Sequence, residues 1–162
     1  MPTPGQLVTI LLFATLAGGC GSWGTILHAK KTVENVPPSA VSPEGAPIYD
    51  LTGKASEQEW SLRFVILRDA LGGLSYCVDK KISESTLAEI AKIPIVILPD
   101  SELAKHGLWA ATDLEAIFIS AHRFNPQTVR HEMLHNYFFI SQRRLFGDPF
   151  HLSSAFAESK CW

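Results

Sequence analysis

The segment NPQTVRHEMLH, residues 125–135, places a helix start directly before a metal-binding pattern. Asn125 is a residue type favoured at the N-cap of a helix. Pro126 fits the first helical position, where its missing N–H would have no partner within the helix. We expect this helix to continue to about Arg143 or Arg144, with the other elements packed around it.

His131 and His135 are four residues apart, so both imidazoles face the same side of the predicted helix. Zn²⁺ accepts neutral imidazole nitrogens at about 2.0–2.1 Å, and two such residues can reach one ion. Glu132 is expected to be the catalytic residue, taking a proton from a water that the ion has activated. The competing interpretation is a helix whose histidines are ordinary surface residues.

A catalytic zinc usually has three protein ligands, so a third is sought downstream of this helix. We predict His151, because Gly147 and Pro149 can turn the chain back toward the helix. The rival is Glu158, on a short final helix. Asp148 is expected to orient an imidazole rather than to bind the ion.

Hydrophobic periodicity predicts the remaining elements. The expected elements are a helix over residues 56–71 ended by Gly72-Gly73, a helix over 83–92, a strand over 93–98, and strands over 108–110 and 115–119 joined by a turn at Thr112-Asp113. This order of helices and strands favours an α+β fold.

The N-terminus has the pattern of an export signal. Residues 7–17, LVTILLFATLA, form an apolar run that is too short to span a bilayer and fits the core of a signal peptide. Gly18-Gly19-Cys20 then resembles the lipobox of bacterial lipoproteins, in which the cysteine becomes lipidated. The alternatives are plain export without lipid, or a buried apolar strand.

This interpretation divides the chain into three parts. Residues 1–19 are the predicted signal peptide, residues 20–49 a lipidated Cys20 followed by a Pro-rich tether, and residues 50–162 the catalytic domain. The protein would be anchored through its lipid in the bacterial cell envelope and would face the periplasm or the exterior.

Two cysteines remain once Cys20 is assigned to the lipid. In an exported protein, Cys77 and Cys161 are expected to form one disulfide that closes a loop of about 84 residues. If the protein is not exported, two free buried thiols become the better interpretation.

Composition excludes some classes of protein. With 162 residues, 46% of them apolar and 19% charged, the chain is suited to one folded domain with a packed core. The net charge of −2 and the absence of a basic run argue against a nucleic-acid partner. Ser153-Ser154 has no base at a recognisable spacing, which argues against a serine hydrolase.

From residue 129 onward the sequence resembles the zincin metallopeptidases, and more narrowly small bacterial lipoproteins with a predicted zincin domain. The residues that carry the likeness are Val129–His135, Gly147–His151 and the near-terminal Cys161. The resemblance implies a small mixed sheet packed against the HExxH helix, with an edge strand, expected at residues 115–120, that pairs with extended peptide near Trp109.

The sequence therefore predicts a membrane-anchored zinc metallopeptidase that cleaves peptide bonds in proteins or peptides. The metzincin continuation HExxHxxGxxH is missing, because Phe138 and Arg144 occupy the positions of its glycine and last histidine. The alternatives are a non-catalytic, zinc-containing envelope lipoprotein that acts as a binding module, and hydrolysis of a non-peptide amide such as a cell-wall component.

Overall fold

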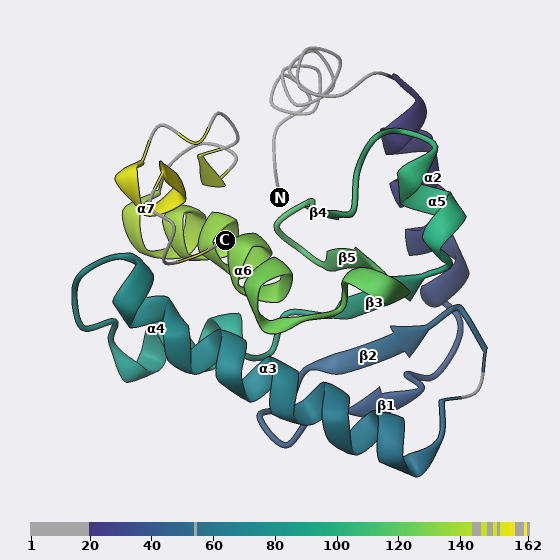
Figure 1. Ribbon diagram of the computed structural model, residues 1–162, viewed down its shortest axis with the longest axis horizontal. Coiled ribbons are helices and arrows are strands. Elements are labelled where there is room, and N and C mark those ends of the chain that lie inside the picture. Colours follow the sequence, from purple (N-terminus) through teal and green to yellow (C-terminus); the bar gives the residue numbers. More distant parts are fainter. Residues whose placement is uncertain are drawn as a thin grey trace.

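A five-stranded sheet lies between helices in the computed structural model, which describes residues 20–53, 55–143, 147, 148, 151, 153–157 and 161 (Figure 1). The helices within these residues are α2 (Cys20–Val33), α3 (Glu57–Cys77), α4 (Glu84–Ile90), α5 (Asp100–Ala104), α6 (Pro126–Gln142) and α7 (Ser154–Ala157). The strands are β1 (Ala40–Val41), β2 (Pro47–Asp50), β3 (Ile95–Leu98), β4 (Ala110–Thr112) and β5 (Ile117–Ser120).

The sheet is mixed and has the order β1-β2-β3-β5-β4. Strands β2, β3 and β5 are parallel, whereas β1 and β4 run antiparallel to their neighbours at the two edges. The predicted α+β class with a small mixed sheet is confirmed. The expectation that residues 115–120 form the edge strand is wrong, because β5 pairs on both sides and β4 takes the edge.

Alternate residues of the central strands enter two separate cores. Ile95 and Ile97 of β3 pack with α3, α4 and α6 in what we call the main core, whereas Val96 and Leu98 pack with α2 and α5 in the second core, on the opposite face. All four residues are buried, which explains why this strand reads as a continuous apolar run rather than as an alternating pattern.

Residues 20–49 differ from the tether expected for them. They form α2, β1 and the start of β2, and β2 pairs in parallel with β3 inside the sheet. Helix α2 packs because Ile26, Ala29 and Val33 follow one another at helical spacing and contact the second core. Three apolar positions beside a Pro-rich stretch are a weak signal, which is why the sequence suggested a linker.

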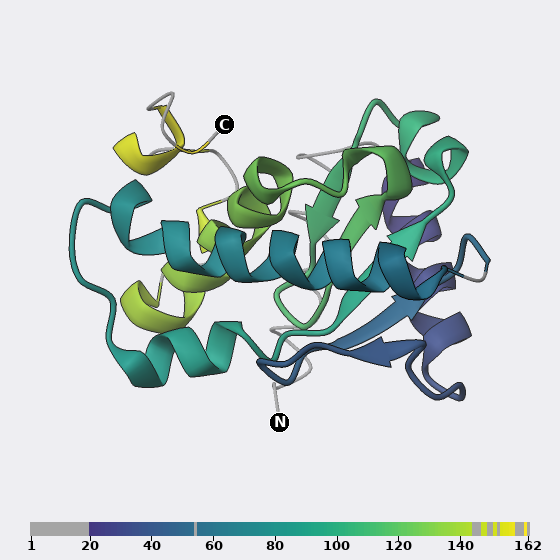
Figure 2. The same cartoon turned by 60° about the horizontal axis from the view of Figure 1, so that its bottom comes forward.

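Helix α3 is longer than expected. It begins with a capping box in which Ser56 accepts from the backbone N–H of Glu59, and it passes through Gly72 and Gly73 to end at Cys77. Helix α6 packs across it, as Figure 2 shows from the side on which α3 lies in front. The helix continues beyond the two glycines because Leu74 and Cys77 are buried in the main core.

The other expected elements are present, with one shift: the strand expected at residues 108–110 is β4 at Ala110–Thr112, so the turn follows Thr112 instead of including it. Ser83 caps α4, β3 falls within the predicted strand, and β4 and β5 form a hairpin. Asn125 accepts from the N–H of Thr128 at 3.0 Å and caps α6, as predicted. Helix α6 ends at Gln142.

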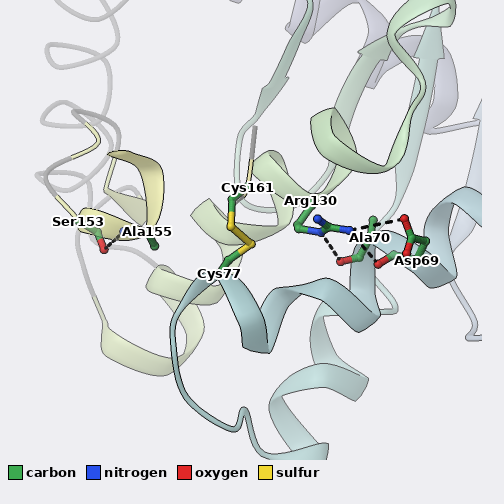
Figure 3. The surroundings of a disulfide bond; sticks show 7 residues. All are labelled: Asp69, Ala70, Cys77, Arg130, Ser153, Ala155 and Cys161. Atoms are coloured by element: carbon green, nitrogen blue, oxygen red, sulfur yellow. Dashed lines mark hydrogen bonds and ion pairs between the residues drawn. A yellow bond between two sulfur atoms is a disulfide. The ribbon is translucent and has the colours of Figure 1, made fainter. Parts of the chain in front are cut away.

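The predicted disulfide is present between Cys77 and Cys161, whose Cα atoms are 5.7 Å apart. It joins the end of α3 to the C-terminal segment (Figure 3). The predicted signal peptide, residues 1–19, and Glu158 lie outside the described residues. Within the part of the chain that is described, no helix combines the length and the apolar character needed to cross a bilayer.

Candidate metal centre

Helix α6 supplies the first two histidines of the candidate centre. His131 and His135 lie one turn apart on the face of α6 that is turned into the protein, and each is less than a tenth exposed. Their ring centroids are 5.0 Å apart. The HExxH pattern is therefore buried, which contradicts the interpretation of these histidines as ordinary surface residues.

His151 joins this pair from the segment that follows α6. The possible ligand nitrogens of His131, His135 and His151 all lie within 4.8 Å of one another. Of the three side chains His151 is the exposed one. The structure thus brings together the three residues that the sequence predicted as metal ligands, close enough to bind one ion.

The spacing of one pair of nitrogens, those of His135 and His151, suits a tetrahedral ion. Two nitrogens bound to such an ion at about 2.0–2.1 Å lie about 3.3–3.4 Å apart. The Nε2 atoms of His135 and His151 are 3.3 Å apart. The same separation also allows a hydrogen bond between the two rings when they share no ion.

A backbone carbonyl orients the second ligand. The Nδ1 atom of His135 lies 2.8 Å from the carbonyl oxygen of Gly147, which can only accept, so Nδ1 carries the proton. The lone pair of a neutral imidazole is then on Nε2, the nitrogen that faces His151. Such contacts fix the tautomer and the ring orientation of metal-binding histidines.

The turn before His151 has a tightly packed backbone. A Cβ atom on Gly147 would lie 2.2 Å from the carbonyl oxygen of His135, and the φ of Gly147 is +64°. Asp148 accepts from the backbone N–H of Ser153 at 2.7 Å through its carboxylate, and from the N–H of His151 at 3.0 Å through its carbonyl. The orienting role expected of Asp148 stays a prediction.

Phe156 contacts all three histidines. Its ring centroid lies 4.4 Å from that of His151, 4.6 Å from His135 and 5.2 Å from His131. The side chain is 3% exposed and also packs against Phe138. No sequence pattern places this residue at the site, since an isolated Phe in a short apolar stretch is most simply core.

Burial keeps the histidines neutral. Burial, together with the positive charges that His135 and His151 can carry, lowers the pKa of His131 to about 3. Burial lowers the pKa of His135 to about 4, although the hydrogen bond to Gly147 acts in the opposite direction. Neutral imidazole is the form that binds a metal ion.

Glu132 lies between the two histidines in sequence and is 5% exposed. Burial in surroundings of low polarity raises the pKa of its carboxyl group to about 8. A cation held by the neighbouring imidazoles would favour the charged form and oppose this shift. A carboxyl group in this position can exchange a proton with a water at the site.

Asn136, which the sequence analysis did not single out, connects α6 to the edge of the sheet. Its Nδ2 donates to the carbonyl oxygen of Glu132 at 3.0 Å and to the hydroxyl of Thr112 in β4 at 3.1 Å. Trp109 directly precedes β4, is about half exposed and stacks on Arg123 at 3.6 Å. The edge strand thus passes close to the HExxH helix.

Two further histidines, His106 and His122, lie outside the cluster. His106 pairs with the hydroxyl of Thr25 and His122 with the carboxylate of Asp100.

Comparison with protein-family models, with curated proteins and with solved structures gives no match to this chain. The activity of the site is therefore inferred from its own residues.

Proposed function

We propose that this protein is a zinc-dependent hydrolase of peptide bonds, with His131, His135 and His151 as ligands and Glu132 as the catalytic residue. The observation that carries the proposal is the convergence of three imidazole nitrogens within 4.8 Å, two of them on α6, the helix that also bears Glu132. Three histidines are a ligand set that zinc uses in catalytic sites, where a fourth position takes water.

The ion and the side chains of the protein would have different roles in the reaction. A zinc ion bound there would lower the pKa of a water and polarise the carbonyl group of the substrate. Glu132 would accept the proton of that water and pass it to the leaving amine. The hydrogen bond from His135 to Gly147 would hold the ligand ring in place while this happens.

The proposed substrate is an extended stretch of peptide or protein. Strand β4 pairs with β5 on one side and is the last strand of the sheet on the other, so its outer backbone groups can pair with a peptide. Asn136 holds this strand beside α6 through Thr112. A peptide on this edge would run past the HExxH helix.

We further propose that Cys20 carries the lipid of an envelope lipoprotein. Helix α2 begins at this residue and packs on the sheet through Ile26 and Ala29. A lipid on Cys20 would therefore hold the domain close to the membrane surface instead of at the end of a long tether. A mass measurement of the mature N-terminus distinguishes lipidation from simple export.

The test of hydrolysis uses the full chain with Cys20→Ser, kept in solution with detergent. We would measure zinc per chain and the cleavage of an unfolded protein by wild-type protein, Glu132→Gln and Glu102→Gln. Glu102 is an exposed carboxylate on α5 and serves as the matched control. We expect about one zinc per chain in all three, and cleavage lowered by at least about 100-fold in Glu132→Gln alone.

A binding module with a structural zinc is the second candidate, and one observation favours it. His131, Glu132 and His135 are all less than a tenth exposed, and the ring of Phe156 contacts both histidines. Stoichiometric zinc without hydrolysis that depends on Glu132 would support this candidate and contradict the peptidase.

A further inference from the structure

The third histidine of the candidate centre lies on a segment that is attached to the rest of the protein at both ends. We call this segment the C-terminal strap, and its described residues are 147, 148, 151, 153–157 and 161. Its near end follows α6, and its far end is Cys161, bonded to Cys77 at the end of α3 (Figure 3). Helices α3 and α6 pack against each other, so both attachments lead back to the helix that bears His131 and His135.

The backbone of the strap is not in a relaxed conformation. Asp148 and His151 have φ angles of 64° and 51°, in the left-handed region that residues with side chains rarely adopt. Such residues keep this geometry only when surrounding contacts impose it. The position of His151 therefore depends on what holds the strap.

Packing holds the middle of the strap. Ala155 and Phe156 are buried in the main core, and the Phe156 ring contacts Phe138 of α6 at a centroid distance of 5.5 Å. Cys161 is 1% exposed and belongs to the same core. The covalent bond to Cys77 fixes the end of this packed stretch.

We propose that Cys77 and Cys161 are positioning residues for the metal centre, and that their disulfide keeps His151 over the pair on α6. With the bond absent, the strap would be covalently attached at one end only, and fewer contacts would impose the left-handed conformation of Asp148 and His151. His131 and His135 would stay in place, because their helix does not depend on the strap for its capping. The inference rests on the metal centre of the proposed function but not on hydrolysis.

The experiment measures cobalt affinity, since Co²⁺ bound by histidines has a visible absorption spectrum that reports the number of ligands. The full chain with Cys20→Ser is compared with three derivatives: Cys77→Ser/Cys161→Ser, His151→Ala, and the combination of all three changes. Serine replaces both cysteines because free thiols would bind cobalt themselves. We expect cobalt binding to weaken by about 10–100-fold in the first derivative and by at least as much in the second.

The combined variant separates positioning from general destabilisation. If the disulfide acts through His151, its removal has no further effect on cobalt affinity once His151 is absent. The proposal would be overturned if removal of the disulfide weakened cobalt binding by a further factor in the combined variant. It would also be overturned if cobalt affinity were unchanged without the disulfide. Unchanged affinity in His151→Ala would overturn both this proposal and the ligand assignment, whereas absence of hydrolysis affects neither.

Leu103→Ala is the control for stability. Leu103 is fully buried in the second core, on the face of the sheet opposite the strap. The Leu103→Ala change should lower the melting temperature and leave cobalt affinity unchanged. A loss of cobalt affinity in this variant would count against positioning by the disulfide.

A second measurement covers the case in which the double-serine variant does not fold. Cobalt-loaded wild-type protein is treated with a water-soluble phosphine, which is oxidised to its oxide with the oxygen of water while the two sulfurs take up two protons and two electrons. Iodoacetamide then alkylates the two thiols, with loss of hydrogen iodide, so that they do not bind cobalt. We expect cobalt to pass to an added chelator at least about 10-fold faster after this treatment. An unchanged rate would contradict the proposal.

Discussion

The imidazole of His135 donates from Nδ1 to the carbonyl oxygen of Gly147, 2.8 Å away. This bond joins a ligand on α6 to the first described residue of the strap that carries His151. It therefore fixes the tautomer of His135 and the position of Gly147, at the near end of the strap that carries His151.

Gly147→Ala should damage both the fold and the metal centre. The added Cβ would lie 2.2 Å from the backbone oxygen of His135, and alanine is disfavoured at a φ of +64°. We expect the free energy of unfolding to fall by about 2–5 kcal/mol, the sum of backbone strain and overpacking. Urea denaturation gives the stability, and a cobalt titration should show weaker binding.

Gly107→Ala is the matched control for this change. Its φ of +70° is nearly the same, but a Cβ there meets no atom within 4 Å. We expect a loss of about 1–2 kcal/mol from backbone strain alone, with unchanged cobalt affinity. Equal behaviour of the two variants would show that the contact between Gly147 and His135 is unimportant.

Zinc should stabilise the protein, and His151→Ala should lose most of this effect. A ligand at 100 times its dissociation constant adds about 2.7 kcal/mol to the free energy of unfolding. If the variant binds zinc about 10–100-fold more weakly, the same zinc concentration adds only about 0.4–1.4 kcal/mol. The shift in melting temperature between zinc and chelator measures this difference.

His122→Ala provides the comparison for His151→Ala. His122 pairs with Asp100 away from the cluster, so the stabilisation by zinc should equal that of the wild-type protein. If His151→Ala keeps the full stabilisation, the third ligand has been assigned to the wrong residue.

The start of α6 and its metal-binding face could be predicted, because the sequence pattern for each lies within a few residues. Asn125 and Pro126 define the start of the helix, and the spacing of His131 and His135 defines its metal-binding face. The apolar runs that became β3 and β5 were equally clear, since both faces of these strands are buried.

What could not be predicted depends on contacts between distant residues. The carbonyl group of Gly147 and the ring of Phe156 reach the site only because the strap folds back on α6. Helix α2 has a short apolar stripe that becomes meaningful only against the sheet. For Gly73, helix propensity indicated a stop, but burial of Leu74 and Cys77 in the main core outweighs it.

Asp50 should make stability depend on pH in acid. Its carboxylate is buried and accepts from Arg63 at 2.6 Å and from the N–H of Thr52 at 2.9 Å. Burial acts to raise the pKa of Asp50, but the hydrogen bonds from Thr52 and Arg63 outweigh burial and leave the pKa below its ordinary value. The ionised form is therefore preferred in the folded protein.

Because the folded-state pKa is the lower one, this contribution is fully present above the unfolded-state pKa of about 3.9 and is lost as the pH falls through the folded-state pKa. We expect Asp50→Asn to cost about 1.5–3 kcal/mol at pH 7, and the difference from wild type to shrink below about pH 4. Urea denaturation across this range measures it. Glu89→Gln, at an exposed position on α4, should leave the pH profile unchanged, and a similar profile change in both variants would contradict the assignment to Asp50.

The adjacent glycines of α3 should respond differently to alanine. A Cβ on Gly72 meets no atom within 4 Å, so Gly72→Ala should stabilise the protein by about 1 kcal/mol through helix propensity. A Cβ on Gly73 would lie 2.4 Å from the guanidinium of Arg130, which donates to the carbonyl oxygens of Ala70 and Asp69 at 3.3 and 3.2 Å. The guanidinium can move aside only by giving up these bonds, which contribute about 1–3 kcal/mol. We therefore expect Gly73→Ala to be less stable than Gly72→Ala by about 1–3 kcal/mol in urea denaturation, and in the background of Arg130→Ala this difference should disappear. A difference that persists without Arg130 would show that another contact requires the glycine.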